Sequence, residues 1–137
     1  MRTFFDSSAF AKRFVDEPGS QTVEDLCSQA TEVCVSVICV PEIVSALNRL
    51  THEQSLTRAQ YLTAKHRLSD DVRDAVIVNL TPAVIRSSIA VLEASRVRAL
   101  DALHVACALE WRAQLFVSAD QRQIVAARKA GLRARQI

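Results

Sequence analysis

Four acidic residues stand where predicted buried segments give way to helices. They are Asp6, Glu42, Asp101 and Asp120. The apolar runs 3–5, 33–38 and 115–117 precede three of them, and the fourth opens an apolar segment that begins at residue 100. Carboxylates gathered at one place repel one another, and a hard divalent cation with oxygen ligands offsets that repulsion best. No Cys–His or Ser–His pair has a spacing suited to nucleophilic catalysis, so this set predicts metal-assisted hydrolysis.

Each of these acids also has an ordinary explanation when it is taken alone. Asp6 and Asp101 could be helix N-caps, and Glu42 could simply favour the positive end of a helix. His104 follows Asp101 by three residues and shares its helix face. For His104 we favour a hydrogen-bonded core histidine over a site residue. Only the four acids together favour a functional site.

The elements that must position these residues alternate between strands and helices. Strands are predicted at 3–5, 33–38, 76–80, 115–117 and 132–137, and helices at 7–14, 21–30, 41–50, 57–72, 82–92, 100–109 and 118–130. This alternation predicts a mostly parallel sheet of four or five strands with helices on both faces. Right-handed connections would bring the carboxyl ends of the strands to one edge, where ligands bind in such folds.

Local signals predict how several of these helices begin and which face they bury. Ser7 or Ser8 is expected to cap the first helix, and Ser118 with Gln121 has capping-box spacing before the last one. Thr57 with Gln60 shows the same pattern. The helix after Thr81-Pro82 is expected to bury a stripe of Val84, Ile85, Ile89 and Leu92.

Composition indicates a single domain over residues 1–137. Half of the residues are hydrophobic and the formal net charge is only +2, so charge alone does not predict a nucleic-acid-binding protein. No apolar run is long enough to span a bilayer, and the first residues lack a signal peptide's pattern, so we expect no membrane association and a cytoplasmic location. The four cysteines form no CxxC pair and are expected to be small buried thiols.

Four stretches, in this order along the chain, resemble the PIN-domain family and in particular the VapC-type ribonuclease toxins of toxin–antitoxin pairs. They read FFDSSAFAKRFVDEPGS, VPEIVSAL, RALDALHVA and FVSADQRQIVAARKAGL. The resemblance implies a three-layer α/β/α PIN-like fold. It also implies an endoribonuclease that hydrolyses RNA phosphodiester bonds with a water activated by Mg²⁺ or Mn²⁺.

Carried over by position, the resemblance places the catalytic and metal-binding acids at Asp6, Glu42, Asp101 and Asp120. Asp6 and Asp101 would be direct ligands, whereas Glu42 and Asp120 would hold a second metal or orient water. Ser7 and Ser118 match small hydroxyl positions that hold ligands in place or touch substrate. Arg13 and Arg122 are candidates for contacts with RNA phosphates, which guanidinium groups suit.

The resemblance also implies partners, namely a second copy of the chain in a homodimer and an antitoxin whose tail covers the acidic cleft. Tyr61, Leu62 and Val91 are apolar residues that one domain is not expected to bury fully. The alternative is a catalytically weak PIN-like module that binds RNA or a basic peptide at the acidic cleft. A phosphatase or receiver domain is disfavoured, because Asp6-Ser7-Ser8 lacks the second acid of a DxD motif and the strand at 76–80 ends without an aspartate.

Overall fold

The computed structural model covers all 137 residues and contains one five-stranded, all-parallel sheet. The strands are β1 (Arg2–Phe5), β2 (Glu32–Ser36), β3 (Val76–Val78), β4 (Leu115–Ser118) and β5 (Ala134–Gln136), in the order β3-β2-β1-β4-β5. The predicted α/β fold with a parallel sheet of four or five strands is therefore confirmed.

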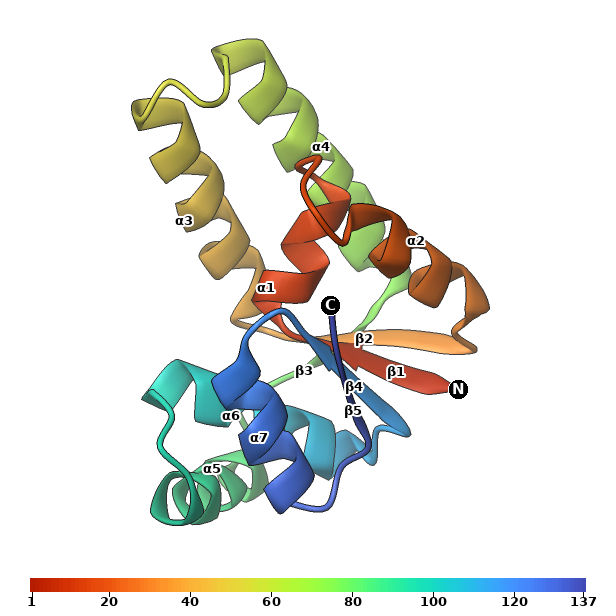
Figure 1. The fold of residues 1–137 in the computed structure, drawn as a ribbon, viewed down its shortest axis with the longest axis vertical. Coiled ribbons are helices and arrows are strands. Elements are labelled where there is room, and N and C mark those ends of the chain that lie inside the picture. Colours follow the sequence, from red (N-terminus) through yellow and green to blue (C-terminus); the bar gives the residue numbers. More distant parts are fainter.

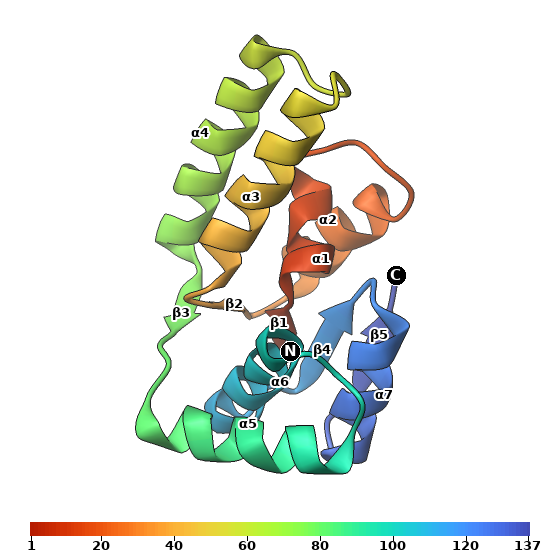
Figure 2. The same ribbon diagram turned by 90° about the vertical axis from the view of Figure 1, so that its left-hand side faces the viewer.

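Seven α-helices and one 3₁₀ turn cover the two faces of the sheet. They are α1 (Ser7–Phe10), the 3₁₀ turn η1 (Ala11–Arg13), α2 (Ser20–Gln29), α3 (Cys39–His52), α4 (Arg58–Asp74), α5 (Pro82–Ala94), α6 (Ala99–Trp111) and α7 (Gln121–Lys129). Helices α1 to α4 lie on one side and α5 to α7 on the other (Figure 1). The α3–α4 hairpin projects away from the sheet, and α5 lies at the opposite end of the molecule (Figure 2).

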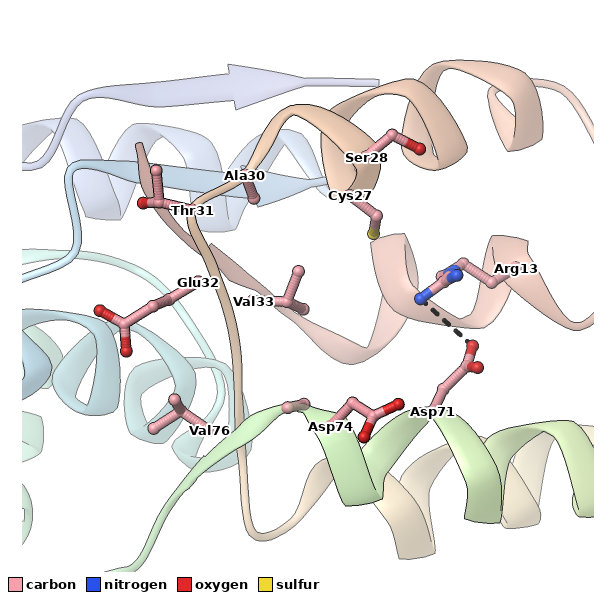
Figure 3. Close-up of a pocket in the computed structure, with 11 residues that line it drawn as sticks. Arg13, Cys27, Ser28, Ala30, Thr31, Glu32, Val33, Asp71, Asp74 and Val76 are labelled. Atoms are coloured by element: carbon pink, nitrogen blue, oxygen red, sulfur yellow. Dashed lines mark ion pairs between the residues drawn. The ribbon is translucent and has the colours of Figure 1, made fainter.

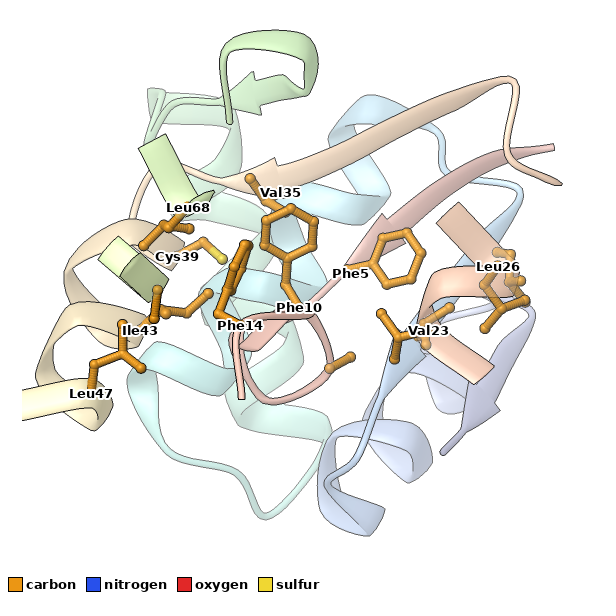
Figure 4. Close-up of a cluster of buried hydrophobic side chains, with 14 of the residues drawn as sticks. Phe5, Phe10, Phe14, Val23, Leu26, Val35, Cys39, Ile43, Leu47 and Leu68 are labelled. Carbon is orange, nitrogen blue, oxygen red and sulfur yellow. The ribbon is translucent and has the colours of Figure 1, made fainter. Parts of the chain in front are cut away.

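The central strand β1 is buried on both faces, and its neighbouring phenylalanines serve two separate cores. Phe5 packs with Phe10 and Phe14 beneath α1 to α4 (Figure 4). Phe4 belongs to the core under α5 to α7 and stacks on Phe116, with ring centroids 5.7 Å apart. A strand covered on both faces reads as a continuous apolar run, which explains why residues 3–5 signal a strand so clearly.

The order of the strands creates a switch point at the middle of the sheet. From β1 the chain moves outward through β2 to β3, and it then returns to the other side of β1 to form β4 and β5. Asp6 directly follows β1, and its backbone N–H donates to the carbonyl oxygen of Val117 in β4 at 3.1 Å. Ligands bind outside the carboxyl ends of strands at such a point, so the topology places Asp6 where a site is expected.

Two predicted serine caps are wrong, because an aspartate takes the role in each case; for α1 this confirms the alternative interpretation of Asp6 as an N-cap. Asp6, not Ser7 or Ser8, caps α1 by accepting a hydrogen bond from the N–H of Ala9. Asp120, not Ser118, caps α7 by accepting from the N–H of Arg122. Ser118 is the last residue of β4, since the strand continues one residue further than predicted.

The predicted capping box of α4 is confirmed, but the buried stripe of α5 is wrong in three of its four residues. The residues of α5 that are buried are Val84, Ser88 and Val91. The apolar residues left exposed are Ile85, Ile89 and Leu92, at 43%, 50% and 40%. Both faces of this helix carry apolar side chains at helical spacing, and the face packed on α6 is rotated from the expected one by about one residue.

Among the three side chains expected to stay partly uncovered, Tyr61 and Val91 are buried and only Leu62 is exposed. Three of the four free cysteines are buried and the fourth, Cys27, is half-buried. Burial raises the pKa of the thiols, to about 11 for Cys27 and about 12 for Cys39. None of the helices has both the length and the apolar character needed to cross a membrane.

Candidate acidic site

The four acidic residues all lie at or just beyond the edge where the strands end. Asp6 follows β1 and Asp120 follows β4 by two residues. Glu42 is in the first turn of α3, shortly after β2, and Asp101 is in the first turn of α6. Hydrogen bonds and charge interactions connect these side chains across segments that are far apart in the sequence, as described below.

Asp6 is fully buried and its carboxylate is held by donors from three segments. Oδ1 accepts from the N–H of Ala9 at 2.9 Å and from Oγ of Ser8 at 2.8 Å. Oδ2 accepts from Oγ of Ser118 and from Nε2 of Gln123, both at 2.7 Å. Burial raises the pKa of Asp6, although the charge interaction with His104 and the hydrogen bonds from Ser118, Ala9 and Ser8 oppose the rise. The carboxylate is thus fixed in position by the protein itself.

Asp101 lies next to this group and is half-buried. Its Oδ1 accepts a hydrogen bond of 3.2 Å from the same Nε2 of Gln123 that donates to Asp6. Burial, and then the negative charge of Asp120, raise the pKa of Asp101, and the charge of Glu42 adds to the rise. A cation beside Asp101 would relieve this repulsion between like charges.

Glu42 is held by a different pair of residues. Nε2 of His104 lies 2.5 Å from Oε1 of Glu42, and the hydroxyl of Ser7 donates to the same oxygen at 2.7 Å. His104 is 1% exposed, so it is a core residue as predicted, but its partner belongs to the acidic site. Burial of Glu42 raises its pKa, but the hydrogen bonds from His104 and Ser7 outweigh burial and leave the pKa below its ordinary value.

Two residues at the site were not predicted from the sequence. Ser8 and Gln123 both donate to Asp6, and Gln123 also reaches Asp101. The one available signal for Gln123 is that it precedes Ile124 on the face of α7 that is buried against the sheet, where a polar side chain needs partners. Ser8 gave no signal beyond its place two residues after Asp6.

The four residues predicted to contact substrate have different surroundings. Ser7 and Ser118 lie inside the site, where they donate to Glu42 and Asp6 respectively. Arg122 is exposed beside Asp120. It lines a pocket of about 600 Å³ with two further exposed basic residues, Arg96 and Lys129.

Arg13 has a structural role remote from this edge. Its guanidinium forms ion pairs with Asp71 at 3.2 Å and with Glu24 at 3.4 Å. It lines a pocket of about 480 Å³ beside the first residues of β2 and β3, where those strands begin (Figure 3). Because its charge is already compensated there, Arg13 is poorly placed to meet RNA at the acidic edge.

The residues present fit a hard divalent cation in their chemistry, because Asp6, Asp101, Asp120 and Glu42 offer only oxygen donors. In the positions seen, however, no three His, Cys, Asp or Glu side chains are gathered closely enough to hold a metal ion. Protein donors occupy both oxygens of Asp6 and Oε1 of Glu42 instead. Holding a cation would therefore require some of these hydrogen bonds to be exchanged for metal–oxygen contacts.

The whole chain was compared with known protein families, sequences and structures. A family model described as "PIN domain" matches residues 3–129. No curated protein sequence matches the chain.

Several solved structures share the fold. A toxin–antitoxin complex from Klebsiella pneumoniae is 14% identical and has a TM-score of 0.68, with 89% of each chain covered. The sarcin–ricin loop cleaving toxin VapC20 of Mycobacterium tuberculosis is 20% identical with a TM-score of 0.68, over 90% of this chain and 94% of that one. VapBC2 from Rickettsia felis, bound to a promoter DNA fragment, is 10% identical with a TM-score of 0.71, over 100% and 99%. At these identities the likeness shows a common fold.

Proposed function

The chain belongs to the PIN-domain family, and from this membership and the acidic edge we propose that it is a metal-dependent endoribonuclease, the toxin of a type II toxin–antitoxin pair. The proposal rests on one observation: at the switch point of the sheet, the side-chain amide of Gln123 donates hydrogen bonds to both Asp6 and Asp101. The toxins with solved structures that share the fold, VapC20 among them, support the same reading.

The proposed roles follow from where each side chain is held. Asp6 and Asp101 would hold the cation, with Asp120 beside them. When bound, Mg²⁺ or Mn²⁺ supplies Lewis-acid polarisation of a phosphoryl oxygen and lowers the pKa of water. Ser8 and Ser118 fix the Asp6 carboxylate, so its orientation does not depend on substrate.

Glu42 is the residue best placed to orient the attacking water or to accept its proton. Its lowered pKa keeps the carboxylate ionised at neutral pH, and it is only half-buried. Both of its hydrogen bonds go to Oε1, which leaves Oε2 able to accept a proton from water or to orient it. General-base assistance of this kind needs an ionised group within hydrogen-bond reach of the nucleophile.

RNA must approach an edge that is itself negative, so nearby cations are needed. Arg96, Arg122 and Lys129 line one pocket that runs along α7, from the first turn next to Asp120 to the last residue of the helix. Guanidinium groups pair well with phosphate oxygens. We propose that the RNA backbone follows this basic pocket and presents a phosphodiester to the acids.

The antitoxin would take the groove between η1 and α3. This groove has a volume of about 390 Å³ and reaches Ser7 and Glu42 at one end. Its apolar lining includes Ala11, Val15, Ile43, Leu47 and Leu50, and the charged residues Lys12, Glu17 and Arg49 also line it. An apolar peptide segment followed by a basic residue suits such a groove, because its charge would meet the acids. A tail that takes this path should bind Mn²⁺-loaded protein less tightly than metal-free protein.

The exposed stripe of α5 is the surface that we propose for the homodimer. Ile85, Ile89 and Leu92 repeat at helical spacing and are all exposed. Contiguous apolar surface of this kind marks interfaces more often than not. Ile89→Asp should convert a dimer to a monomer in light scattering coupled to size-exclusion chromatography, whereas Leu62→Asp, on α4, should leave the mass unchanged.

The proposed activity is tested by incubating the purified protein with RNA in Mn²⁺ or in EDTA. Cleavage that needs the metal and leaves 5′-phosphate and 3′-hydroxyl ends supports a hydrolytic nuclease. The competing function, a PIN-like module that binds RNA or a basic peptide without turnover, is favoured by the absence of three gathered ligands. Binding without cleavage in Mg²⁺ and in Mn²⁺ would establish that alternative.

A further inference from the structure

Gln123 joins two carboxylates of the acidic site through a single nitrogen atom. Its Nε2 donates to Oδ2 of Asp6 at 2.7 Å and to Oδ1 of Asp101 at 3.2 Å. The residue is 4% exposed and lies on the buried face of α7. Two carboxylates this close to one amide would otherwise repel each other, and the two N–H groups offset that repulsion without a cation.

The orientation of this amide is set by the carboxylates. Its Oε1 is buried and has no hydrogen-bond partner. The oxygen and the nitrogen of a buried side-chain amide normally both have hydrogen-bond partners, so the unpaired Oε1 needs an explanation. Turning the amide over would point Oε1 at the oxygens of Asp6 and Asp101, acceptor against acceptor. Gln123 therefore leaves its oxygen unpaired in order to give both carboxylates a donor.

We propose that Gln123 sets the affinity of the acidic site for its divalent cation, by competing with the cation for Asp6 and Asp101. This inference rests on the proposed function, which assigns those two residues as ligands. A carboxylate oxygen that accepts a short N–H bond is less available to a metal, so the amide must be displaced before both carboxylates can bind the cation. The two hydrogen bonds from Gln123 also stabilise the paired carboxylates when no cation is bound.

The test replaces Gln123 by methionine, which keeps the length of the side chain but removes both polar atoms. Gln121→Met is the matched control, since Gln121 is exposed on the same helix. We expect Gln123→Met to unfold at a lower temperature in EDTA and to bind Mn²⁺ about tenfold more tightly in calorimetry, the order expected for one charge-assisted hydrogen bond. Gln121→Met should match the wild type in both measurements.

Two further variants distinguish the hydrogen bonds that Gln123 donates to Asp6 and Asp101 from a general packing role of its side chain. In an Asp101→Asn background only one of the two carboxylates remains, so the loss of thermal stability in EDTA caused by Gln123→Met should shrink. Gln123→Asn, whose amide is too short to reach both carboxylates, should tighten Mn²⁺ binding as well, and it replaces the methionine variant if that protein does not fold.

The outcomes distinguish this inference from the function on which it rests. Wild-type protein that binds Mn²⁺ with the same affinity as Gln123→Met and Gln123→Asn would overturn the competition and leave the nuclease proposal standing. Weaker Mn²⁺ binding by both variants would also overturn it, because Gln123 would then be a ligand through Oε1. Wild-type protein that binds no Mn²⁺ would overturn both proposals together.

Discussion

His104 and Glu42 form a hydrogen-bonded pair at the acidic edge, with Nε2 of the imidazole 2.5 Å from Oε1 of the carboxylate. The imidazole is fully buried, and its Nδ1 has no partner, so the contact with Glu42 is the main polar interaction that this side chain makes. Ser7 completes the group, with its hydroxyl 3.2 Å from the same Nε2. The role of His104 is thus to position Glu42.

Replacing His104 by leucine should release Glu42. The pKa of Glu42 is below its ordinary value of 4.5. Ionised Glu42 therefore stabilises the folded protein at pH values above 4.5, and this stabilisation is lost as the pH falls through the lowered pKa. In His104→Leu the pKa of Glu42 should rise, and that acid-dependent loss of stability should be smaller. Carboxyl NMR titration measures the shift. His52→Leu, at an exposed position, is the control, and an unmoved Glu42 pKa in His104→Leu would refute the pairing.

Ser118→Ala should destabilise the protein by about 1–3 kcal/mol, because a buried hydroxyl that donates to the Asp6 carboxylate is lost. The same hydroxyl accepts from the N–H of Asp120, which would also lose its partner. The pKa of Asp6 should rise further, since the bond from Ser118 lowers it. Urea unfolding at neutral pH measures the effect against Ser45→Ala, an exposed control; equal stability of the two variants would contradict this role.

Asp101 should make the stability of the protein depend on pH in a specific direction. Burial and the charge of Asp120 raise its pKa above the ordinary 3.8, so its contribution to stability is greatest in acid and is lost as the pH rises through the raised pKa. In EDTA, the wild type should therefore lose stability relative to Asp101→Asn as the pH is raised from about 4. Asp74→Asn, exposed at the end of α4, should show no such trend, and a difference between wild type and Asp101→Asn that is independent of pH would exclude the effect.

Arg122 and Arg13 should differ in their effect on RNA binding, measured in an Asp101→Asn background so that cleavage is prevented. Arg122→Ala should weaken binding and flatten the salt dependence of log K by about 0.7 for one lost phosphate contact on single-stranded RNA. Arg13→Ala should leave that slope unchanged and instead lower the melting temperature, because it removes ion pairs with Asp71 and Glu24. The reverse pattern would place the RNA path on the other side of the molecule.

The sequence predicts where the acidic residues lie in the fold better than it predicts their hydrogen-bond partners. Alternating strands and helices place Asp6, Glu42 and Asp120 after β1, β2 and β4, which are neighbours in the sheet, because parallel connections leave little freedom in where the strands end. The partners of these acids depend on side chains that meet only in the folded chain, such as Gln123 with Asp6. The face of α5 illustrates the same limit: with apolar residues on two sides, the packing of α6 decides which face is buried.

The proposed function requires that RNA hydrolysis depend on the acidic site together with a divalent cation. The measurement is the rate of RNA cleavage in Mn²⁺ by the wild type, by Asp101→Asn and by the control Asp74→Asn, each repeated in excess EDTA. We expect the wild type and Asp74→Asn to cleave at equal rates, Asp101→Asn to be slower by at least about a hundredfold, and EDTA to abolish cleavage in every case. Undiminished cleavage by Asp101→Asn, or by the wild type in EDTA, would contradict the proposed function.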